Sequence, residues 1–553
     1  MATAANERRE APRRGSNLPR EAGRTPGSTY QSAKSELSKS DGEKLERLLQ
    51  QLRLRRMAVE PKFSDDVIVW PSRSAVAGGA ELATLNAINL GNAAEALGPR
   101  VQGRGVPRMR LLKQIDDVSV MRANSSALLA MRRNTPGLRV APAAWAYLQY
   151  IRPLGDELEA TAIQVAPGAK VRRFELLLSD PQGRPVPGVR VKALVDWDGA
   201  HVPAVTDSQG IASIGIPVLY PRVEMILVEP EHTHWSVFVK GFDRIAAPKR
   251  LNVQALPLVP DSFQLLANYA PYDPQAGAGV TVGVIDSGVG PHADIAVADG
   301  ACFVTGENAA DFLDNGIGHG THVAGIIAGK KAADTGIYGL APACRLLAYR
   351  VCAKTGERGR AKSTDIASAL ERAISDGCHI VNISMGSLEP MPEMPDLLQK
   401  ARDAGVVVFA ATGNDGQPLL RYPARYSHTL AVGALGHDGT FPADCPESFQ
   451  ESEIRHKKEF VAEFSNYGLS TDFIGPGVAV LSTFPGEKYA MMSGTSMATP
   501  YSSGMAARLL SGNSKLLNMP KGPERADAII EMLSQAAQKV GWPAEYEGFG
   551  VLK

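Results

Sequence analysis

The chain of 553 residues has few cysteines, no long apolar run and almost no net charge. Its five cysteines are odd in number, irregularly spaced and confined to the C-terminal half, which favours reduced thiols in a cytosolic protein over a disulfide framework. No stretch approaches the roughly 18 uninterrupted apolar residues that a membrane-spanning helix requires. A formal net charge of +1 gives no reason to expect nucleic acid or a membrane as a partner. No CxxC or His/Cys cluster indicates a zinc site.

The N-terminal segment is basic and poor in large apolar residues. Arginines at 8, 9, 13, 14, 20 and 24 outnumber the glutamates among the first 24 residues. This composition is typical of a solvated, disordered tail, and a basic interaction arm is the alternative. Because no apolar core follows the arginines, the segment does not resemble a standard secretory signal. We therefore expect a cytoplasmic protein, and export without a leader stays open.

The character of the sequence changes three times, which predicts four segments. Residues 1–60 form the basic tail and a short charged helix with leucines at helical spacing. Residues 61–152 alternate apolar runs with an Ala- and Leu-rich helical stretch at 80–97 and a short helix at 125–133, as expected of a small α/β unit. In 153–255, short alternating strands between Gly, Pro and Asp turns predict a small antiparallel β-sandwich. That stretch resembles the Ig-like accessory modules of multidomain bacterial proteins, which bind, space or brace.

From residue 256 to 553, compact apolar runs alternate with helical stretches. The predicted strands are 280–285, 345–351, 379–384, 406–411 and 429–432, and the predicted helices are 321–328, 364–376 and 395–404. Runs that are apolar on both faces predict a parallel sheet covered by helices on each side. Active groups of such an α/β fold lie beyond the carboxyl ends of the strands.

Three short motifs of this region fall at a strand end or a helix start. VGVIDSG (282–288) places Asp286 at the end of a buried strand, and NGIGHGTHVAG (315–325) places His319 between two glycines. SGTSMATP (493–500) places Ser496 at a helix N-terminus, where the helix dipole favours developing negative charge. Taken alone, such an aspartate is usually a turn former and such a histidine is usually structural.

Together, in the order Asp, His, Ser, these motifs resemble those of the subtilisin-like serine proteases, peptidase family S8, over about residues 260–553. The resemblance implies a serine endopeptidase with the family's α/β fold. Ser496 would be the nucleophile, His319 the general base, and Asp286 the residue that orients the imidazole and stabilises its cation. Asn414, which follows a buried strand in Thr-Gly-Asn, would be a donor of the oxyanion hole.

The resemblance also implies where a protein or peptide substrate binds. Its backbone would pair beside Ser384, Met385 and Gly386, with Gly413 bordering the same cleft. Arg421 precedes Tyr-Pro where secreted members commonly have glycine, at the base of the pocket for the P1 side chain. Two interpretations stay open. Arg421 either points into the pocket, which would favour acidic P1 side chains over bulky apolar ones, or points to solvent without effect.

No metal or cofactor is expected to be required. Calcium stabilises many secreted relatives, but the matching loop holds Asp334 without an asparagine-rich sequence, and Asp294 is the only other plausible ligand. The segment at 438–464 is longer and more charged than the family's usual connection, which predicts a surface excursion, with a partner-binding loop as the alternative. Residues 118–140 look like the second half of an inhibitory propeptide, which predicts a self-processing zymogen, and an unrelated α/β module is the alternative.

The sequence therefore favours a selective intracellular processing protease restrained by its N-terminal domains. A pseudoprotease that only binds peptides is one alternative, but it should lack a triad member or the oxyanion donor, and neither is missing. In another interpretation the first 250 residues are the functional part, and the protease releases them by a cut between 245 and 275.

Overall fold

The computed structural model describes residues 39–59, 62–71, 109–115, 118–124, 127–128, 131, 138–150, 156, 158–230, 232–242, 249–252, 264–331, 336–356 and 359–553. The basic tail and the helical stretch expected near 80–97 lie outside these residues. Only part of the short helix expected at 125–133 is described. None of the described helices is long and apolar enough to cross a membrane. All five cysteines are described, and they are buried and unpaired.

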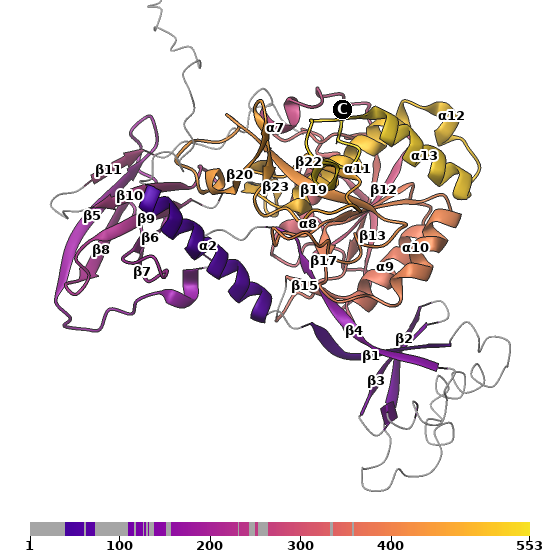
Figure 1. Cartoon of the computed structure of the whole chain (residues 1–553), viewed down its shortest axis with the longest axis horizontal. Helices are drawn as coiled ribbons and strands as arrows, with labels where there is room; N and C mark the ends of the chain where they lie inside the picture. The colour runs from indigo at the N-terminus through magenta and orange to yellow at the C-terminus, as the bar shows by residue number, and fades with distance from the viewer. Residues whose placement is uncertain are drawn as a thin grey trace, which may run out of the picture.

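A nine-stranded sheet forms the centre of the C-terminal region (Figure 1). Its strands are, in spatial order, β13 (Val297–Cys302), β14 (Arg345–Arg350), β12 (Thr281–Asp286), β16 (Ile380–Ile383), β18 (Val407–Ala411), β19 (Leu430–His437), β21 (Glu459–Ala462) and β20 (Glu451–His456), with β22 (Phe473–Pro476) also beside β19. The strands from β13 to β19, and β22, run parallel, which confirms the predicted α/β organisation. The sheet is nevertheless mixed, because the excursion at 438–464 folds back as the antiparallel pair β20 and β21.

Alternate residues of the central strands face two separate cores. Helices α8 (His319–Ala328), α11 (Thr495–Ser511) and α13 (Pro523–Ala536) cover one face, and α9 (Ser363–Ser375) and α10 (Met394–Asp403) cover the other. In β12, Val282 and Val284 belong to the first core and Ile285 to the second. Because strand side chains alternate between faces, a sheet covered on both sides needs apolar residues at every position. This explains the continuous apolar runs in the sequence.

Shorter elements complete this region. They are α7 (Gln264–Ala267), the pair β23 (Val480–Phe484) and β24 (Lys488–Met492), η3 (Pro446–Gln450), α12 (Ser514–Leu517), α14 (Ala544–Glu547), and the pair β25 (Ala537–Gln538) and β26 (Val551–Leu552). We call residues 264–553, which contain the three motifs predicted to carry the catalytic triad, the catalytic region.

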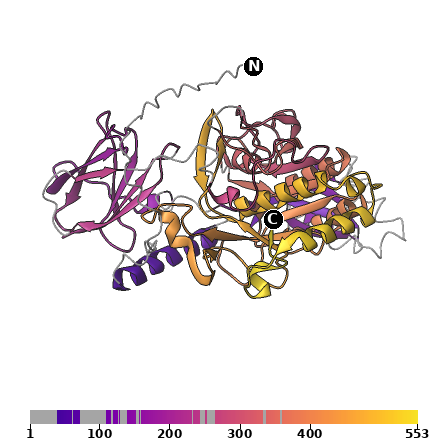
Figure 2. The same ribbon diagram turned by 90° about the horizontal axis from the view of Figure 1, so that it is seen from above.

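Residues 171–252 contain two sheets that share a core, the β5–β11 unit. One sheet has the order β10 (Val237–Phe242), β9 (Val223–Glu229), β6 (Arg190–Leu194), β7 (His201–Val205), and the other has the order β11 (Lys249–Asn252), β5 (Val171–Ser179), β8 (Ile211–Pro217). Leu176, Val191 and Ile226 are among the residues of the shared core. The expectation of purely antiparallel pairing is wrong for β11, which runs parallel to β5. Figure 2 shows the unit to one side of the catalytic region.

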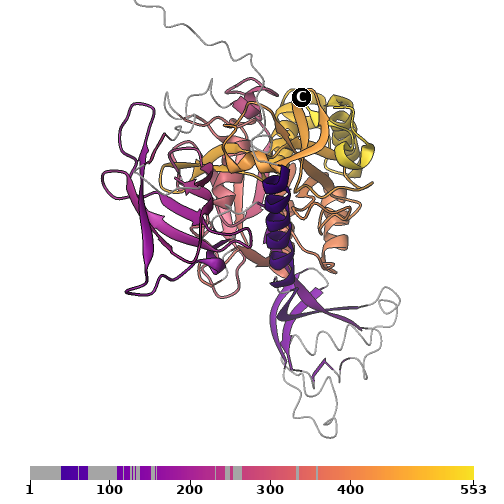
Figure 3. The ribbon, with the colours of Figure 1, turned by 60° about the vertical axis from the view of Figure 1, so that its left-hand side comes forward.

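Helix α2 (Lys39–Val59) covers the outer face of the β10–β9–β6–β7 sheet. Its apolar stripe consists of Leu45, Leu48 and Leu52, all buried. The stripe packs with residues of the β5–β11 unit and its approach, and with one residue of the excursion: Leu158, Leu194, Met225, Leu227, Phe238 and Phe449. Figure 3 shows α2 between the β5–β11 unit and the catalytic region. One apolar cluster therefore joins three parts of the chain.

A second small sheet precedes the β5–β11 unit. Its strands β1 (Phe63–Pro71), β2 (Met109–Ile115), β3 (Val118–Ala123) and β4 (Leu138–Leu148) are antiparallel, in the order β4, β1, β3, β2, and we call them the β1–β4 unit. The end of β4 continues into the catalytic region, where it pairs with β15 (Arg360–Lys362) and β17 (Met385–Gly386). An ion pair of 2.6 Å between Lys113 of β2 and Asp365 of α9 adds a second attachment.

Glu393, which immediately precedes α10, should make stability depend on pH. Burial raises the pKa of Glu393 from 4.5 to about 7. A carboxyl that binds its proton more tightly in the folded state stabilises the fold fully below the unfolded pKa, and this contribution is lost as the pH rises through the folded pKa. We expect Glu393→Gln, which mimics the protonated acid, to raise Tm at pH 8 but not at pH 4.5. The rise at pH 8 should correspond to at most about 3 kcal/mol in the free energy of unfolding.

Thermal unfolding at the two pH values checks this, in a Ser496→Ala background that avoids self-digestion. Glu371→Gln on α9 is the control, because Glu371 is partly exposed and pairs with Lys400 across 3.5 Å. Equal changes of Tm at both pH values would contradict a titration of Glu393 in this range.

Candidate active site

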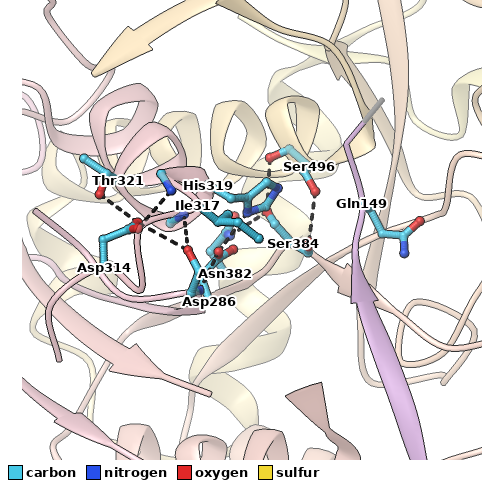
Figure 4. A network of polar contacts seen from close by, with 12 residues as sticks. Gln149, Asp286, Asp314, Ile317, His319, Thr321, Asn382, Ser384 and Ser496 are labelled. Carbon is cyan, nitrogen blue, oxygen red and sulfur yellow. Dashed lines mark hydrogen bonds and ion pairs between the residues drawn. The ribbon is translucent and has the colours of Figure 1, made fainter. Parts of the chain in front are cut away.

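Three polar side chains meet at the carboxyl edge of the central sheet (Figure 4). Asp286 ends β12, His319 begins α8 and Ser496 lies in the first turn of α11, and all three are buried. His319 Nδ1 lies 2.7 Å from Asp286 Oδ1. Because the carboxylate accepts the Nδ1–H, the neutral imidazole keeps Nε2 as an acceptor, which is the tautomer that a general base needs.

The glycines on either side of His319 permit the close approach of α8 to β12. A Cβ on Gly320 would lie 2.2 Å from the carbonyl oxygen of Gly288, and one on Gly318 would lie 2.0 Å from the ring of Phe484. Gly318 also has a φ of 80°, which glycine adopts without steric cost. The Gly-His-Gly sequence is therefore required by packing as well as by chemistry.

Asp314, which is not among the site residues predicted from the sequence, organises the loop that precedes His319. Its Oδ1 accepts the backbone N–H groups of Gly316 and Gly318, both at 2.8 Å, and its Oδ2 accepts the Thr321 hydroxyl at 3.0 Å. Burial raises the pKa of Asp314. The Asp-Asn-Gly sequence at 314–316 is a turn signal that could have indicated this role.

The nucleophile candidate Ser496 is linked to the end of β16. Its hydroxyl donates to the carbonyl of Ser384 at 2.9 Å, and the Ser384 hydroxyl donates to the carbonyl of Ser496 at 3.1 Å. Asn382 Nδ2 donates to Ser384 Oγ at 2.9 Å and completes this link (Figure 4). The Ser496 hydroxyl must therefore turn from Ser384 toward His319 before it can give up its proton, a rearrangement common when a reacting complex forms.

Asn414 lies in the loop after β18, beside the start of α11. Its carboxamide oxygen accepts the N–H and the hydroxyl of Thr495, each at 2.9 Å, which leaves Nδ2 as the donor end. The Ser496 N–H donates to the carbonyl oxygen of Gln149 at 2.8 Å. A Cβ on Gly494 would lie 2.5 Å from that oxygen and 3.3 Å from Asn414 Nδ2. A backbone carbonyl thus accepts the hydrogen bond of one expected oxyanion donor, the Ser496 N–H, on the side of Gly494 that also faces the Asn414 amide.

The end of β4 lies along the edge expected to bind substrate. Leu148 pairs with Met385 and Tyr147 pairs with Gly386, both in antiparallel register. The Gln149 N–H then donates to the carbonyl of Ser384 at 3.1 Å. The residues expected to bind substrate therefore contact the chain's own backbone.

Arg421 matches neither of the two interpretations of the sequence in full, because its aliphatic part lies beside the pocket while its charge is paired elsewhere. It is buried, and its guanidinium forms a two-pronged ion pair with Asp415, with distances of 2.7 and 2.6 Å. A Cβ on Gly386 would lie 2.9 Å from Arg421 Cβ and 3.3 Å from Gln149 Cδ, and one on Gly413 would lie 2.9 Å from Arg421 Cγ. The aliphatic part of Arg421 therefore lies by the Gln149 side chain, while its charge is neutralised by Asp415. A preference for acidic P1 side chains would require a guanidinium that is not already paired, and the Arg421 guanidinium is paired with Asp415.

No group of three or more His, Cys, Asp or Glu that could hold a metal occurs among the described residues. Asp294 Oδ2 accepts the Ile337 N–H at 2.9 Å and the Tyr489 hydroxyl at 2.8 Å. Asp334, the other calcium candidate, lies outside the described residues.

Comparison with known proteins agrees with this geometry. A model of the subtilase family matches residues 277–550. Subtilisin BL from Lederbergia lenta is 39% identical over 243 residues, which cover 44% of this chain and 80% of that protein. The chain belongs to the subtilase family. Subtilisin Savinase from the same organism is 38% identical with the same coverage, and M-protease from Shouchella clausii is 38% identical over 57% of its length.

Membership of the subtilase family supports a serine endopeptidase and implies the Asp-His-Ser triad. It also corrects one prediction. The expectation of a cytoplasmic protein is wrong, because the relatives that match the catalytic region are secreted, extracellular subtilisins. Unpaired, buried cysteines were a poor guide to the compartment, since a large apolar core can hold thiols for packing alone.

We expect Asn414→Ala to lower kcat by about 10²–10³-fold with little change in KM, because the amide stabilises charge that develops only in the transition state. Steady-state hydrolysis of a peptide substrate by the processed enzyme checks this. Asn513→Ala is the control, since the Asn513 side chain caps the short helix α12 and contacts Met532 Sδ at 3.8 Å. A fall in kcat of less than tenfold would exclude Asn414 as an oxyanion donor.

Proposed function

We propose that this subtilase is an active, selective processing endopeptidase that is made as a precursor and restrained by its own N-terminal segment. The observation that carries the proposal is the hydrogen bond from the Ser496 N–H to the carbonyl of Gln149. While this bond and the pairing of β4 persist, the oxyanion hole and the substrate edge are both filled. Another protein or peptide can bind only after β4 leaves.

In this proposal the β1–β4 unit, within residues 61–152, is the propeptide. The β5–β11 unit, within residues 153–255, is an accessory β-sandwich placed between the propeptide and the catalytic region. The attachment of β4 to strands of the catalytic region, and the ion pair between Lys113 and Asp365, support the inhibitory role.

The side chains at the site account for acyl transfer. Ser496 Oγ attacks the substrate carbonyl while His319 accepts its proton, and Asp286 stabilises the imidazolium. Asn414 and the Ser496 N–H stabilise the oxyanion. His319 then gives the proton to the leaving amine, and water hydrolyses the acyl-enzyme. Each of these groups is present, which argues against a pseudoprotease that only binds peptides.

The idea that the protease releases the first 250 residues has less support. The cut was expected between 245 and 275, and within that stretch residues 245–248 and 253–263 lie outside the described residues. The backbone that does occupy the site belongs to Gln149 and Tyr150, about a hundred residues earlier.

We expect the wild-type chain to cleave itself and to become active against peptides after a lag. Ser496→Ala should stay intact and inactive, because loss of the nucleophile of a triad lowers kcat about 10⁶-fold. Intact-mass measurement, a fluorogenic peptide assay and labelling by a fluorophosphonate test this on both chains. Identical cleavage of the wild-type and Ser496→Ala chains would contradict the proposal. A wild-type chain that stays intact and unlabelled would also contradict it.

A further inference from the structure

We propose that the bond between Gln149 and Tyr150 is the one that the enzyme cuts in itself, and that its S1 pocket selects glutamine. This inference rests on the proposed function. The Gln149 carbonyl oxygen receives the Ser496 N–H at 2.8 Å, as a scissile carbonyl would. The next residue lies on the leaving-group side, since the ring of Tyr150 is 5.2 Å from that of His319. Gln149 is therefore P1, the residue whose carbonyl is attacked.

The cut itself is an ordinary hydrolysis. Ser496 Oγ bonds to the Gln149 carbonyl carbon and passes its proton to His319 Nε2. The bond from that carbon to the Tyr150 nitrogen breaks, and His319 protonates the new amine. A water molecule then hydrolyses the ester, which leaves a carboxylate on Gln149 and restores Ser496.

The surroundings of the Gln149 side chain favour a neutral hydrogen-bond donor. The side chain is 3% exposed, and Figure 4 shows it directed away from the triad. Its Nε2 donates to the carbonyl of Tyr147 at 2.7 Å and to that of Gly386 at 3.4 Å. A carboxylate has no proton to donate to these two oxygens and would be repelled by them. Glutamine should therefore be preferred to glutamate.

The side of the S1 pocket next to Arg421 should disfavour large aromatic P1 side chains. The Arg421–Asp415 pair is buried, and Asn466 holds the carboxylate: Asn466 Nδ2 donates to Asp415 Oδ2 at 2.9 Å, and the Asp415 N–H donates to Asn466 Oδ1 at 2.8 Å. The network keeps the methylene groups of Arg421 between Gly386 and Gly413. These atoms should reduce the room for a large aromatic P1 side chain without offering it a charge.

The first arm of the test is the N-terminus of the self-processed wild-type enzyme, which should be Tyr150. The second is kcat/KM for peptides that differ only at P1, where we expect glutamine to exceed glutamate and phenylalanine by about tenfold or more. Arg421→Met with Asp415→Asn removes both charges but keeps the volume, so the order should persist. Arg421→Ala with Asp415→Asn opens the pocket and should raise cleavage after phenylalanine.

The outcomes separate this inference from the proposed function. An active enzyme with a different new N-terminus, or with glutamate preferred, would overturn the glutamine assignment and leave the zymogen proposal intact. A glutamate preference lost in the Arg421→Met, Asp415→Asn variant would show that Arg421 acts as a cation after all. Equal processing of wild type and Ser496→Ala would defeat both.

A different observation carries a second inference, that helix α2 retains the cleaved N-terminal fragment. The cut would leave α2 and β4 on one fragment, residues 1–149, and the β5–β11 unit on the other. Leu45 and Leu48 of α2 are only 2% and 1% exposed in the cluster that they share with Phe238 and Phe449. Phe449 belongs to the excursion, whose Asp444 carbonyl also accepts the Phe238 N–H at 2.8 Å.

The fragment would therefore have two attachments, β4 in the cleft and α2 on this apolar cluster. Two contacts carried by one molecule reinforce each other, because the bound one keeps the other at high effective concentration. We infer that loss of the N-terminal fragment, and hence activation, is slower than hydrolysis and depends on α2.

Leu48→Asp tests this inference against Leu54→Asp, a matched control on the same helix whose side chain is 56% exposed. After processing, fragment 1–149 should co-elute with the enzyme in wild type and Leu54→Asp and should separate in Leu48→Asp. Activity should appear on the order of tenfold sooner in Leu48→Asp. Leu45→Ala is a milder second variant, and uncleaved Ser496→Ala versions of each chain check folding. Equal release from all of the cleaved chains would overturn the inference.

Discussion

One strand belongs to two structures at once, and the rest of the chain is arranged around it. The first part of β4 pairs with β1 and completes the small N-terminal sheet, while its last part pairs with β15 and β17 of the catalytic region. This pairing fixes the register that brings the carbonyl of Gln149 to the Ser496 N–H. A slip of one residue would turn the side chains to the opposite faces and remove that carbonyl from the site. The strand that completes the sheet of the β1–β4 unit is therefore the same strand that fills the substrate cleft.

The catalytic region was predictable because its chemistry and its fold use the same residues. The strand ending at Asp286 and the helix beginning at His319 could be read from apolar runs and glycines, and the structure shows why those glycines are needed: side chains there would collide with Gly288 and Phe484. The parallel core followed from runs that were apolar at every position. In each case the residues of a short segment can pack favourably in only one arrangement, so the local sequence was enough to predict it.

The parts that escaped prediction depend on contacts between distant or irregular segments. The partner of Arg421 lies only six residues away, but the loop between them must fold before the two side chains meet. The excursion at 438–464 was expected at the surface, yet it adds two strands to the sheet and carries Phe449 into the cluster beneath α2. The leucines of α2 predicted a helix and could not indicate which of several apolar faces it would cover.

The antiparallel pairing of β4 on both of its edges also restricts what this cleft can accept from another protein. Residues 145–148 are held as a fully stretched ribbon, with neighbours on two sides. In a helix, the backbone N–H and C=O groups are hydrogen-bonded within the helix and cannot pair with the edges of the cleft. In a strand inside a folded sheet, these groups are already bonded to the neighbouring strands. Any target must therefore bring a tail, a long loop or an unfolded stretch of about five residues. Whether a protein is cleaved would then depend first on whether it has such an unfolded segment, and only afterwards on the sequence of that segment.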